Sequence, residues 1–264
     1  MTIRAISYGG GVQSTALLVL AAQREIDFPL AIFANVGDDS ENPASIDYLH
    51  EHAIPYAAAN GIELVTVQRT RRNGDPVTLM GQLKSANRSI DIPVRMATGA
   101  PGNRNCTAEF KIKPVANELK RRGATKDDPA VLALGISVDE YQRMRTNTGI
   151  AWETFAYPLI ERRIDRAGCG GIITRAGLPV PPKSSCYFCP YFSLAQRRRQ
   201  LSEHPDLFEK SAQLEDILNE RRAMLGKDNV FLTSRLVPLR LAIVDDGQLD
   251  MFAPSCDIGG YCHA

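Results

Sequence analysis

The chain has 264 residues and a formal net charge of +1, from 31 basic and 30 acidic side chains. This balance excludes the strong positive field that draws many proteins to nucleic acid. Hydrophobic residues make up 44% of the sequence, and no apolar run is long enough to span a bilayer, so the composition is that of a globular protein without a membrane segment. The first predicted strand starts almost at the N-terminus and leaves no room for a signal peptide, so we expect a cytoplasmic location.

The first motif is a glycine-rich turn between a predicted strand and a predicted helix. An apolar run at 3–8 is followed by three glycines at 9–11, and a helical pattern then opens with Ser14 and Thr15 in its first turn. Consecutive backbone N–H groups at a helix N-terminus attract an anion, most often a phosphate. The turn has neither the lysine of a Walker loop nor the glycine spacing of a Rossmann turn. The alternative is a glycine-rich turn that binds nothing.

Strand and helix patterns alternate along the first two thirds of the chain. Predicted strands cover 3–8, 28–36, 62–67 and 130–136, and predicted helices cover 12–24, 43–60 (with Pro55 expected to interrupt it) and 107–122. This alternation predicts an α/β fold with a doubly wound, mostly parallel sheet and helices on both faces. A strongly helical stretch, 193–226, follows. Its arginines are interpreted as solvent-facing, with a basic groove for tRNA or DNA phosphates as the alternative.

Acidic residues follow the second predicted strand. Asp38 and Asp39 come directly after it, and the carboxyl ends of parallel strands are where open α/β sheets bind ligands. A role in holding Mg²⁺ or a ribose is one interpretation. The other is an N-cap cluster for the helix that follows.

Six cysteines in a reducing compartment indicate metal or redox chemistry rather than structural disulfides. Cys186 and Cys189 form a Cys-x-x-Cys pair followed by proline, a spacing that brings two sulfurs to one point. An iron–sulfur cluster, a zinc ion and a redox dithiol are the alternatives. Cys106 precedes a predicted helix, where the pKa of a thiol is expected to be lowered.

The glycine turn resembles the pyrophosphate-binding loop of the adenine-nucleotide α-hydrolase (PP-loop) superfamily, whose pattern is S-G-G-x-D-S. A glycine replaces the first serine and Gln13 replaces the aspartate. The form S-x-G-G-G-x-Q-S-T is similar to the branch related to phosphoadenylylsulfate (PAPS) reductase. The resemblance implies that ATP or a PAPS-like adenylyl nucleotide binds here. The implied contacts from the turn are Ser7, Gly9, Gly10, Gly11, Gln13, Ser14 and Thr15.

Later segments match the same family in order. The implied nucleotide contacts outside the turn are Asp38, Gly135, Arg143 and Arg145, and residues 157–159 match a Y-P-L element. The stretch from Cys106 resembles a C-C-x-x-x-K-x-x-P element that binds a [4Fe–4S] cluster in adenylylsulfate reductases. Thr107 stands in place of its second cysteine, and Lys111 matches its lysine.

The resemblance implies a cluster held by four thiolates. The expected ligands are Cys106, Cys169, Cys186 and Cys189, with Cys262 as the rival for the fourth position and zinc as the rival metal. In this assignment Cys256 and Cys262 form a mobile redox or sulfur-carrying pair, and they are the expected catalytic residues together with Lys111. The chain is divided into a nucleotide-binding α/β domain at 1–185 and, at 186–264, the Cys-x-x-Cys segment, a helical extension and a cysteine-bearing tail.

The leading functional prediction is an enzyme that uses ATP to adenylate an acceptor and then introduces sulfur. The expected acceptor is a tRNA base or a DNA phosphate, and a sulfur donor is required. One alternative is a PAPS or adenylylsulfate reductase that works with a thioredoxin-like reductant and releases sulfite. The other is a non-catalytic nucleotide or redox sensor, which the loss of the aspartate at Gln13 favours.

Overall fold

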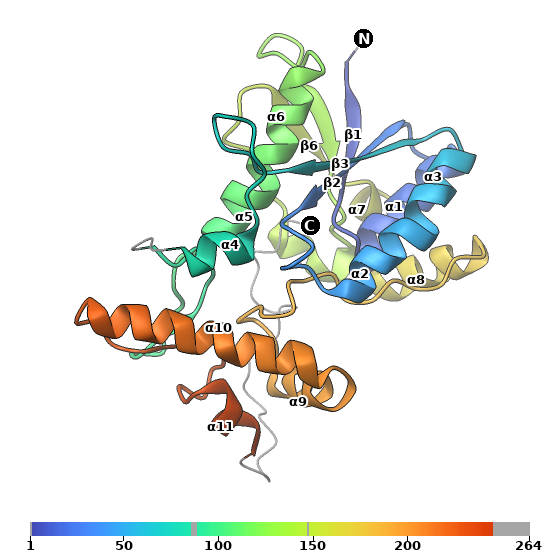
Figure 1. Cartoon of the computed structure of the whole chain (residues 1–264). Coiled ribbons are helices and arrows are strands. Elements are labelled where there is room, and N and C mark those ends of the chain that lie inside the picture. The colour runs from blue at the N-terminus through green and yellow to red at the C-terminus, as the bar shows by residue number, and fades with distance from the viewer. Residues whose placement is uncertain (1, 86–88, 147, 245–264) are drawn as a thin grey trace.

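The computed structural model describes residues 2–85, 89–146 and 148–244 (Figure 1). Its centre is a five-stranded parallel sheet in the order β3-β2-β1-β5-β6. The strands are β1 (Arg4–Tyr8), β2 (Leu30–Asn35), β3 (Glu63–Gln68), β5 (Ala130–Ala133) and β6 (Glu153–Ala156). The four predicted strands are present with shifted ends, and β6 was not predicted. The α/β class is therefore confirmed.

Side chains alternate between the two faces of the sheet, and both faces are apolar. Ile6 and Phe33 belong to one core, which is covered by α1 (Val12–Ala22), α2 (Pro43–Tyr48), α3 (Ile54–Ala59) and α8 (Arg166–Arg175). Ala5 and Ile32 belong to the core on the other face, which α6 (Lys113–Arg121) covers. Figure 1 shows α6 on one side of the sheet and the α1–α3 and α8 helices on the other. The sheet is therefore covered on both faces, as predicted.

Two helices pass through a proline without stopping. A π-helical turn, Leu49–Ala53, connects α2 to α3, and a second one, Ala108–Ile112, connects the short α5 (Asn105–Thr107) to α6. Pro55 and Pro114 lie near the start of the α-helix after each π-turn. A proline ring clashes with the carbonyl four residues earlier, and in both helices that carbonyl lies inside the wider turn. Pro55 was expected to interrupt its helix, but the helix continues through it.

The C-terminal part of the described chain is helical, as predicted. It contains α9 (Leu194–Glu203), α10 (Pro205–Met224) and α11 (Leu239–Val244). A third core joins Phe188 and Phe208 of this part to Leu79 and Phe110 of the preceding α/β part, so the two parts share buried surface. The remaining elements are α4 (Leu79–Lys84), the 3₁₀ helix η3 (Val138–Arg143), α7 (Pro158–Glu161) and the antiparallel pair β4 (Arg95–Met96) and β7 (Val230–Phe231). No helix among the described residues is both long and apolar enough for a membrane span.

Candidate functional site

The glycine turn after β1 presents backbone rather than side chains. Gly10 has φ of +72°, a conformation that favours glycine, and Gly11 is the N-cap of α1. The Ser14 hydroxyl is engaged by the Gly11 backbone, since Oγ accepts from its N–H at 3.2 Å and donates to its carbonyl at 3.0 Å. The Thr15 hydroxyl lies 3.1 Å from the Tyr8 hydroxyl in the core. Both predicted hydroxyl contacts are thus occupied within the protein, and the turn offers its amide groups to a ligand.

A pocket of about 1080 Å³, solvent-open space included, joins this turn to three cysteines. We call it the glycine-loop pocket. Gly9, Gly11 and Gln13 contribute to its lining, and so do Cys106, Cys186 and Cys189. The described residues that line it include five cations and a single acid: Arg104, Lys111, Arg143, Arg166, Lys183 and Glu140. This excess of positive charge beside the backbone of a glycine turn suits a polyanion.

Gln13 is the centre of a buried polar network. Its amide nitrogen donates to Glu140 Oε2 at 3.2 Å, and its oxygen accepts from Arg166 Nη1 at 2.9 Å. Arg143 in turn donates to Glu140 Oε2 at 2.6 Å. An amide satisfies both the carboxylate and the guanidinium, whereas an aspartate at position 13 would repel Glu140. Gln13 therefore orients two arginines at the pocket, and one of them is Arg143, an expected nucleotide contact.

Gly135 follows β5 and lines the same pocket. A Cβ at this position would lie 2.9 Å from the Ser14 nitrogen and 3.1 Å from the Gln13 carbonyl carbon. Backbone atoms cannot yield as the end of a side chain does, so the glycine is needed for close packing against α1. Gly135 was expected to let a nucleotide pack closely on its backbone. The structure gives it a second reason to be glycine, which is the close packing of its backbone against α1.

The three cysteines of the glycine-loop pocket influence one another. Burial raises the pKa of the Cys186 thiol well above its ordinary value, and Glu41, Cys189 and Cys106 raise it further. Burial also raises the pKa of Cys106 to about 11, against the lowering influence of Arg104 and Lys111. The lowered pKa expected from its place before a helix is therefore wrong, because desolvation outweighs the short helix end.

Cys169 lies away from this group. It is fully buried in α8 on the face of the sheet that α1 covers, in a different core from Cys106 and Cys186. Burial raises its pKa to about 12, and the charges that act on it are those of Asp139, Asp165 and Arg166. The structure does not bring Cys169 to the other three cysteines. The described residues contain no group of three or more His, Cys, Asp or Glu side chains arranged to hold a metal ion.

A fully buried arginine holds the Cys-x-x-Cys loop. Arg197 of α9 donates to the carbonyls of Tyr187 and Cys189, at 3.0 and 2.9 Å, and to Gln200 Oε1 at 2.8 Å. Gln200 and Ser211 also donate to the Tyr187 carbonyl. The interpretation of this arginine as solvent-facing is wrong, because α9 packs directly on the loop. Its guanidinium is a buried positive charge that holds the backbone of the Cys-x-x-Cys loop.

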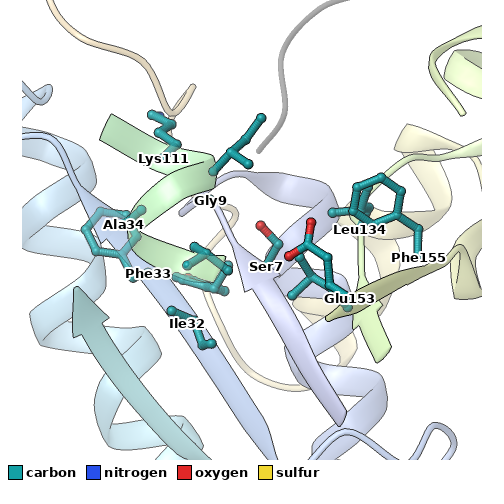
Figure 2. A pocket seen from close by; sticks show the side chains of 13 residues that line it. Ser7, Gly9, Ile32, Phe33, Ala34, Lys111, Leu134, Glu153 and Phe155 are labelled. Atoms are coloured by element: carbon teal, nitrogen blue, oxygen red, sulfur yellow. The ribbon is translucent and has the colours of Figure 1, made fainter. Parts of the chain in front are cut away.

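Lys111 lies where two cavities meet. It lines the glycine-loop pocket and also a second pocket of about 500 Å³ on the α6 face of the sheet, which we call the strand pocket (Figure 2). Its Nζ is 3.9 Å from Oε1 of Glu41, a carboxylate with 1% exposure that forms a backbone bridge with Cys186. Lys111 is therefore central to the site.

The strand pocket is apolar except at its ends. Its lining comes from β2, from β5 and the residue after it, from β6, from η2 and from the start of α6: Ile32, Phe33, Ala34, Leu132, Leu134, Phe155, Ile112 and Val115. Gly9 and Lys111 lie at the junction with the glycine-loop pocket, and Ser7 and Glu153 supply oxygens inside it (Figure 2). Desolvation raises the pKa of the Glu153 carboxyl to about 7.

Some expected contacts lie elsewhere. Asp38 accepts from Asn35 Nδ2 at 2.7 Å, and it lines a separate cavity with Asp39 rather than the glycine-loop pocket. Asp39 accepts from the Thr78 hydroxyl. Arg145 is exposed and is not part of the glycine-loop pocket lining. The expected catalytic residues Cys256 and Cys262 lie outside the described residues.

Several pocket residues were missed from the sequence. Lys183 and Ser184 precede the Cys-x-x-Cys pair, and the Ser184 hydroxyl donates to the Gly9 carbonyl, which ties that segment to the glycine turn. Their position next to the cysteines was an available signal. Arg166 and Glu140 carried no such signal, since their shared partner Gln13 is far away in the sequence. Glu153 carried none because the segments that line its pocket with it are distant in the sequence.

Comparisons with known proteins add little to this geometry. No protein-family model and no curated protein matches the chain. Among solved structures, it is similar to the U34-tRNA thiolase NcsA from Methanococcus maripaludis with its [4Fe–4S] cluster. The TM-score is 0.45 and the sequence identity 16%, over 85% of this chain and 72% of that one. A likeness this loose carries no argument about function, so the site is interpreted from its own residues.

Proposed function

We propose that the protein is a nucleotide-dependent enzyme that adenylates an acceptor and then replaces the adenylate with sulfur. The observation that carries the proposal is the glycine-loop pocket, in which a phosphate-binding turn, an excess of cations and three thiols share one cavity. A nucleotide-binding turn alone would fit many activities. Thiols facing it make sulfur chemistry at the bound nucleotide the best-supported choice.

In this proposal the triphosphate of ATP lies on the backbone amides of Gly9, Gly10 and Gly11. Arg166 and Arg143 neutralise its outer charges, and both are already oriented through Gln13 and Glu140. Lys111, at the junction of the two pockets, is at the level of the α-phosphate when the base occupies the strand pocket. Fixed donors at the point where charge develops are the main source of catalysis in phosphoryl transfer.

The three thiols fit a sulfur-rich metal centre in donor type. Cys106, Cys186 and Cys189 line one pocket whose described lining contains no fourth cysteine and no histidine, a donor set that would suit a cluster with one iron open to another ligand better than a closed four-coordinate zinc site. When bound, a [4Fe–4S] cluster would hold the incoming sulfur donor beside the nucleotide. Lys111 and Arg104 supply positive charge around the thiolates. Mg²⁺ bound with the nucleotide would further balance its phosphates.

The proposed chemistry has two steps. An oxygen of the acceptor attacks the α-phosphorus of ATP, the bond from that phosphorus to the bridging oxygen of the β-phosphate breaks, and pyrophosphate leaves. A sulfide-level donor then attacks the activated carbon or phosphorus of the acceptor, and AMP leaves with the former acceptor oxygen. Backbone amides and Lys111 stabilise the charge that develops on the phosphate oxygens in the first step.

A basic groove supports a nucleic acid as the acceptor. It follows the end of β3 and the η2–α6 segment, which also carries Lys111. Five basic and two acidic side chains line it: Arg69, Arg71, Arg72, Lys113, Arg121, Glu109 and Glu118. Phosphate oxygens of a tRNA or a DNA strand are the ligands that such a surface attracts.

Two other functions use the same pocket. A PAPS or adenylylsulfate reductase would place a sulfate where the pyrophosphate lies here and would release sulfite, and the thiols of the glycine-loop pocket favour this second candidate. A non-catalytic sensor would bind nucleotide and release nothing. Loss of the aspartate at position 13 is a weaker argument for a sensor, since Glu140 brings a carboxylate to Gln13.

A product assay separates these functions. The full chain, purified without oxygen, is incubated with ATP or PAPS, a mixed tRNA and DNA pool, sulfide and reduced thioredoxin. Pyrophosphate and AMP from ATP, dependent on the nucleic acid, support the proposal. Sulfite from PAPS would replace it with the reductase. Nucleotide binding without either product would leave the sensor.

A further inference from the structure

The strand pocket lies where the base of a nucleotide bound at the glycine turn would reach. It opens beside Gly9 and Lys111, which it shares with the glycine-loop pocket, and it continues between the sheet and the η2–α6 segment. Apolar residues of β2, β5 and β6 line it, with Phe155 among them (Figure 2). A nucleotide with its phosphates on the glycine turn would therefore reach this pocket with its base. This step rests on the proposed function.

One polar side chain in this pocket, that of Glu153, is buried without a hydrogen-bond partner in the described part of the protein. Glu153 has 5% exposure and lines the strand pocket. Its carboxyl group makes no hydrogen bond or ion pair within the described part of the chain, and its oxygens border the open space of the pocket. Its backbone is accounted for, with the N–H directed to the Ile150 carbonyl and the C=O accepting from the Thr148 hydroxyl. Burial of an acid without a partner is costly, and proteins keep such groups where a ligand supplies the partner.

We infer that Glu153 reads the base of the bound nucleotide, with its protonated carboxyl group hydrogen-bonded to the edge of an adenine ring in the strand pocket. A protonated carboxyl has an O–H donor beside a C=O acceptor. Adenine presents the matching pair, an N6 donor beside a ring-nitrogen acceptor. An ionised carboxylate has only acceptors, and it would suit the two adjacent donors of guanine instead.

The surroundings favour the protonated form. The pKa of Glu153 is raised to about 7 by desolvation, and no neighbouring charge contributes to that shift. The other charged or titratable residues in the described lining are Lys111 from η2 and Tyr8 from β1, whose hydroxyl lies beside Thr15 in the core on the α1 face, while β2 and β5 contribute apolar residues. Lys111 is directed to Glu41, and burial keeps Tyr8 neutral by raising its pKa. Adenine binding would thus take up a proton at neutral pH.

Three forms of the full, reduced chain test this inference by calorimetry between pH 6 and 8.5. Glu153→Gln keeps a donor beside an acceptor permanently, so it stands in for the protonated acid. Glu153→Leu keeps the approximate volume and removes both groups. The probes are ATP, GTP and inorganic pyrophosphate, which has no base. Comparing the wild type with Glu153→Gln at each pH cancels the titration of the phosphates themselves.

The ratio of the ATP dissociation constant of the wild type to that of Glu153→Gln is expected to rise about 30-fold from pH 6 to 8.5, as the carboxyl ionises around its raised pKa. Over the same pH range the affinity for GTP relative to that for ATP should rise in the wild type and stay constant in Glu153→Gln. Glu153→Leu should weaken ATP about 10- to 100-fold, with pyrophosphate binding unchanged.

Two results would overturn the inference: a ratio that stays flat with pH, or a leucine variant that binds ATP like the wild type. If ATP and pyrophosphate still bound in that case, the proposed function would survive. If neither ATP nor pyrophosphate bound the wild type, both proposals would fail together.

Discussion

Replacing Arg197 tests the claim that a buried cation supports the Cys-x-x-Cys loop. Arg197→Met removes three hydrogen bonds, to the carbonyls of Tyr187 and Cys189 and to Gln200. It also removes the positive charge that acts on the buried carboxylate of Glu215. Loss of one partner from a buried charged network costs about 3–5 kcal/mol. For a chain of this size that corresponds to a fall in Tm of about 10 °C.

The same helix provides a matched control. Arg199 is 76% exposed and forms an ion pair with Glu203 at 3.3 Å, so Arg199→Met should change the stability by less than about 0.5 kcal/mol. Both variants are melted as the reduced, metal-free chain and followed by circular dichroism. The reasoning is refuted if Arg197→Met melts within about 2 °C of the wild type, or if the two variants are equally destabilised.

Three further predictions concern other parts of the site. Gly135→Ala brings a Cβ to 2.9 Å from the Ser14 nitrogen and should lower the free energy of unfolding by about 1–3 kcal/mol in a urea titration. The control Gly170→Ala has open space around its Cβ and should raise the free energy of unfolding by about 0.5–1 kcal/mol. The opposite order of stability would contradict the packing at Gly135. After anaerobic reconstitution with iron and sulfide, Cys186→Ala should lose the visible absorbance and Cys169→Ala should keep it; equal loss would return Cys169 to the ligand set. Glu153→Gln should gain stability over the wild type between pH 4.5 and about 7, because over this range the unfolded wild type has lost the proton that the folded wild type still holds. The gain should level off at about 3 kcal/mol above pH 7, and a difference that stays constant from pH 4.5 to 7 would refute the buried acid.

Local signals account for the parts of the fold that were predicted. The strand, glycine turn and first helix follow one another within twenty residues, and each has a pattern that does not depend on the rest of the chain. The same holds for the later buried strands and for α9 and α10. β6 was missed because it is a four-residue edge strand with a glutamate and a threonine in it, so it has no apolar run. Its place beside β5 depends on pairing between residues 23 positions apart.

Long-range packing accounts for the parts of the site that were missed. Cys169 is close to the Cys-x-x-Cys pair in the sequence, but α8 carries it to the opposite side of the sheet, against α1. Arg197 has the same helical surroundings as Arg199, and only the contact of α9 with the cysteine loop buries one of them. Gln13 acquires its role from partners more than 120 residues away. No periodicity or spacing reports such contacts.

The central claim is that the phosphates of an adenylyl nucleotide lie on the glycine turn of the glycine-loop pocket, and Gly11 gives the most direct test of it. Gly11 is the N-cap of α1 with φ of −102°, and a Cβ there meets only Ser184, at 3.6 Å, so both serine and aspartate fit and both are favourable N-caps. Gly11→Asp adds a negative charge where the phosphates are expected, and Gly11→Ser makes a similar change without the charge. Calorimetry with ATP should show binding to the wild type and to Gly11→Ser but a loss of at least about tenfold in Gly11→Asp, with unchanged Tm values. Equal ATP affinity in all three proteins would contradict the account.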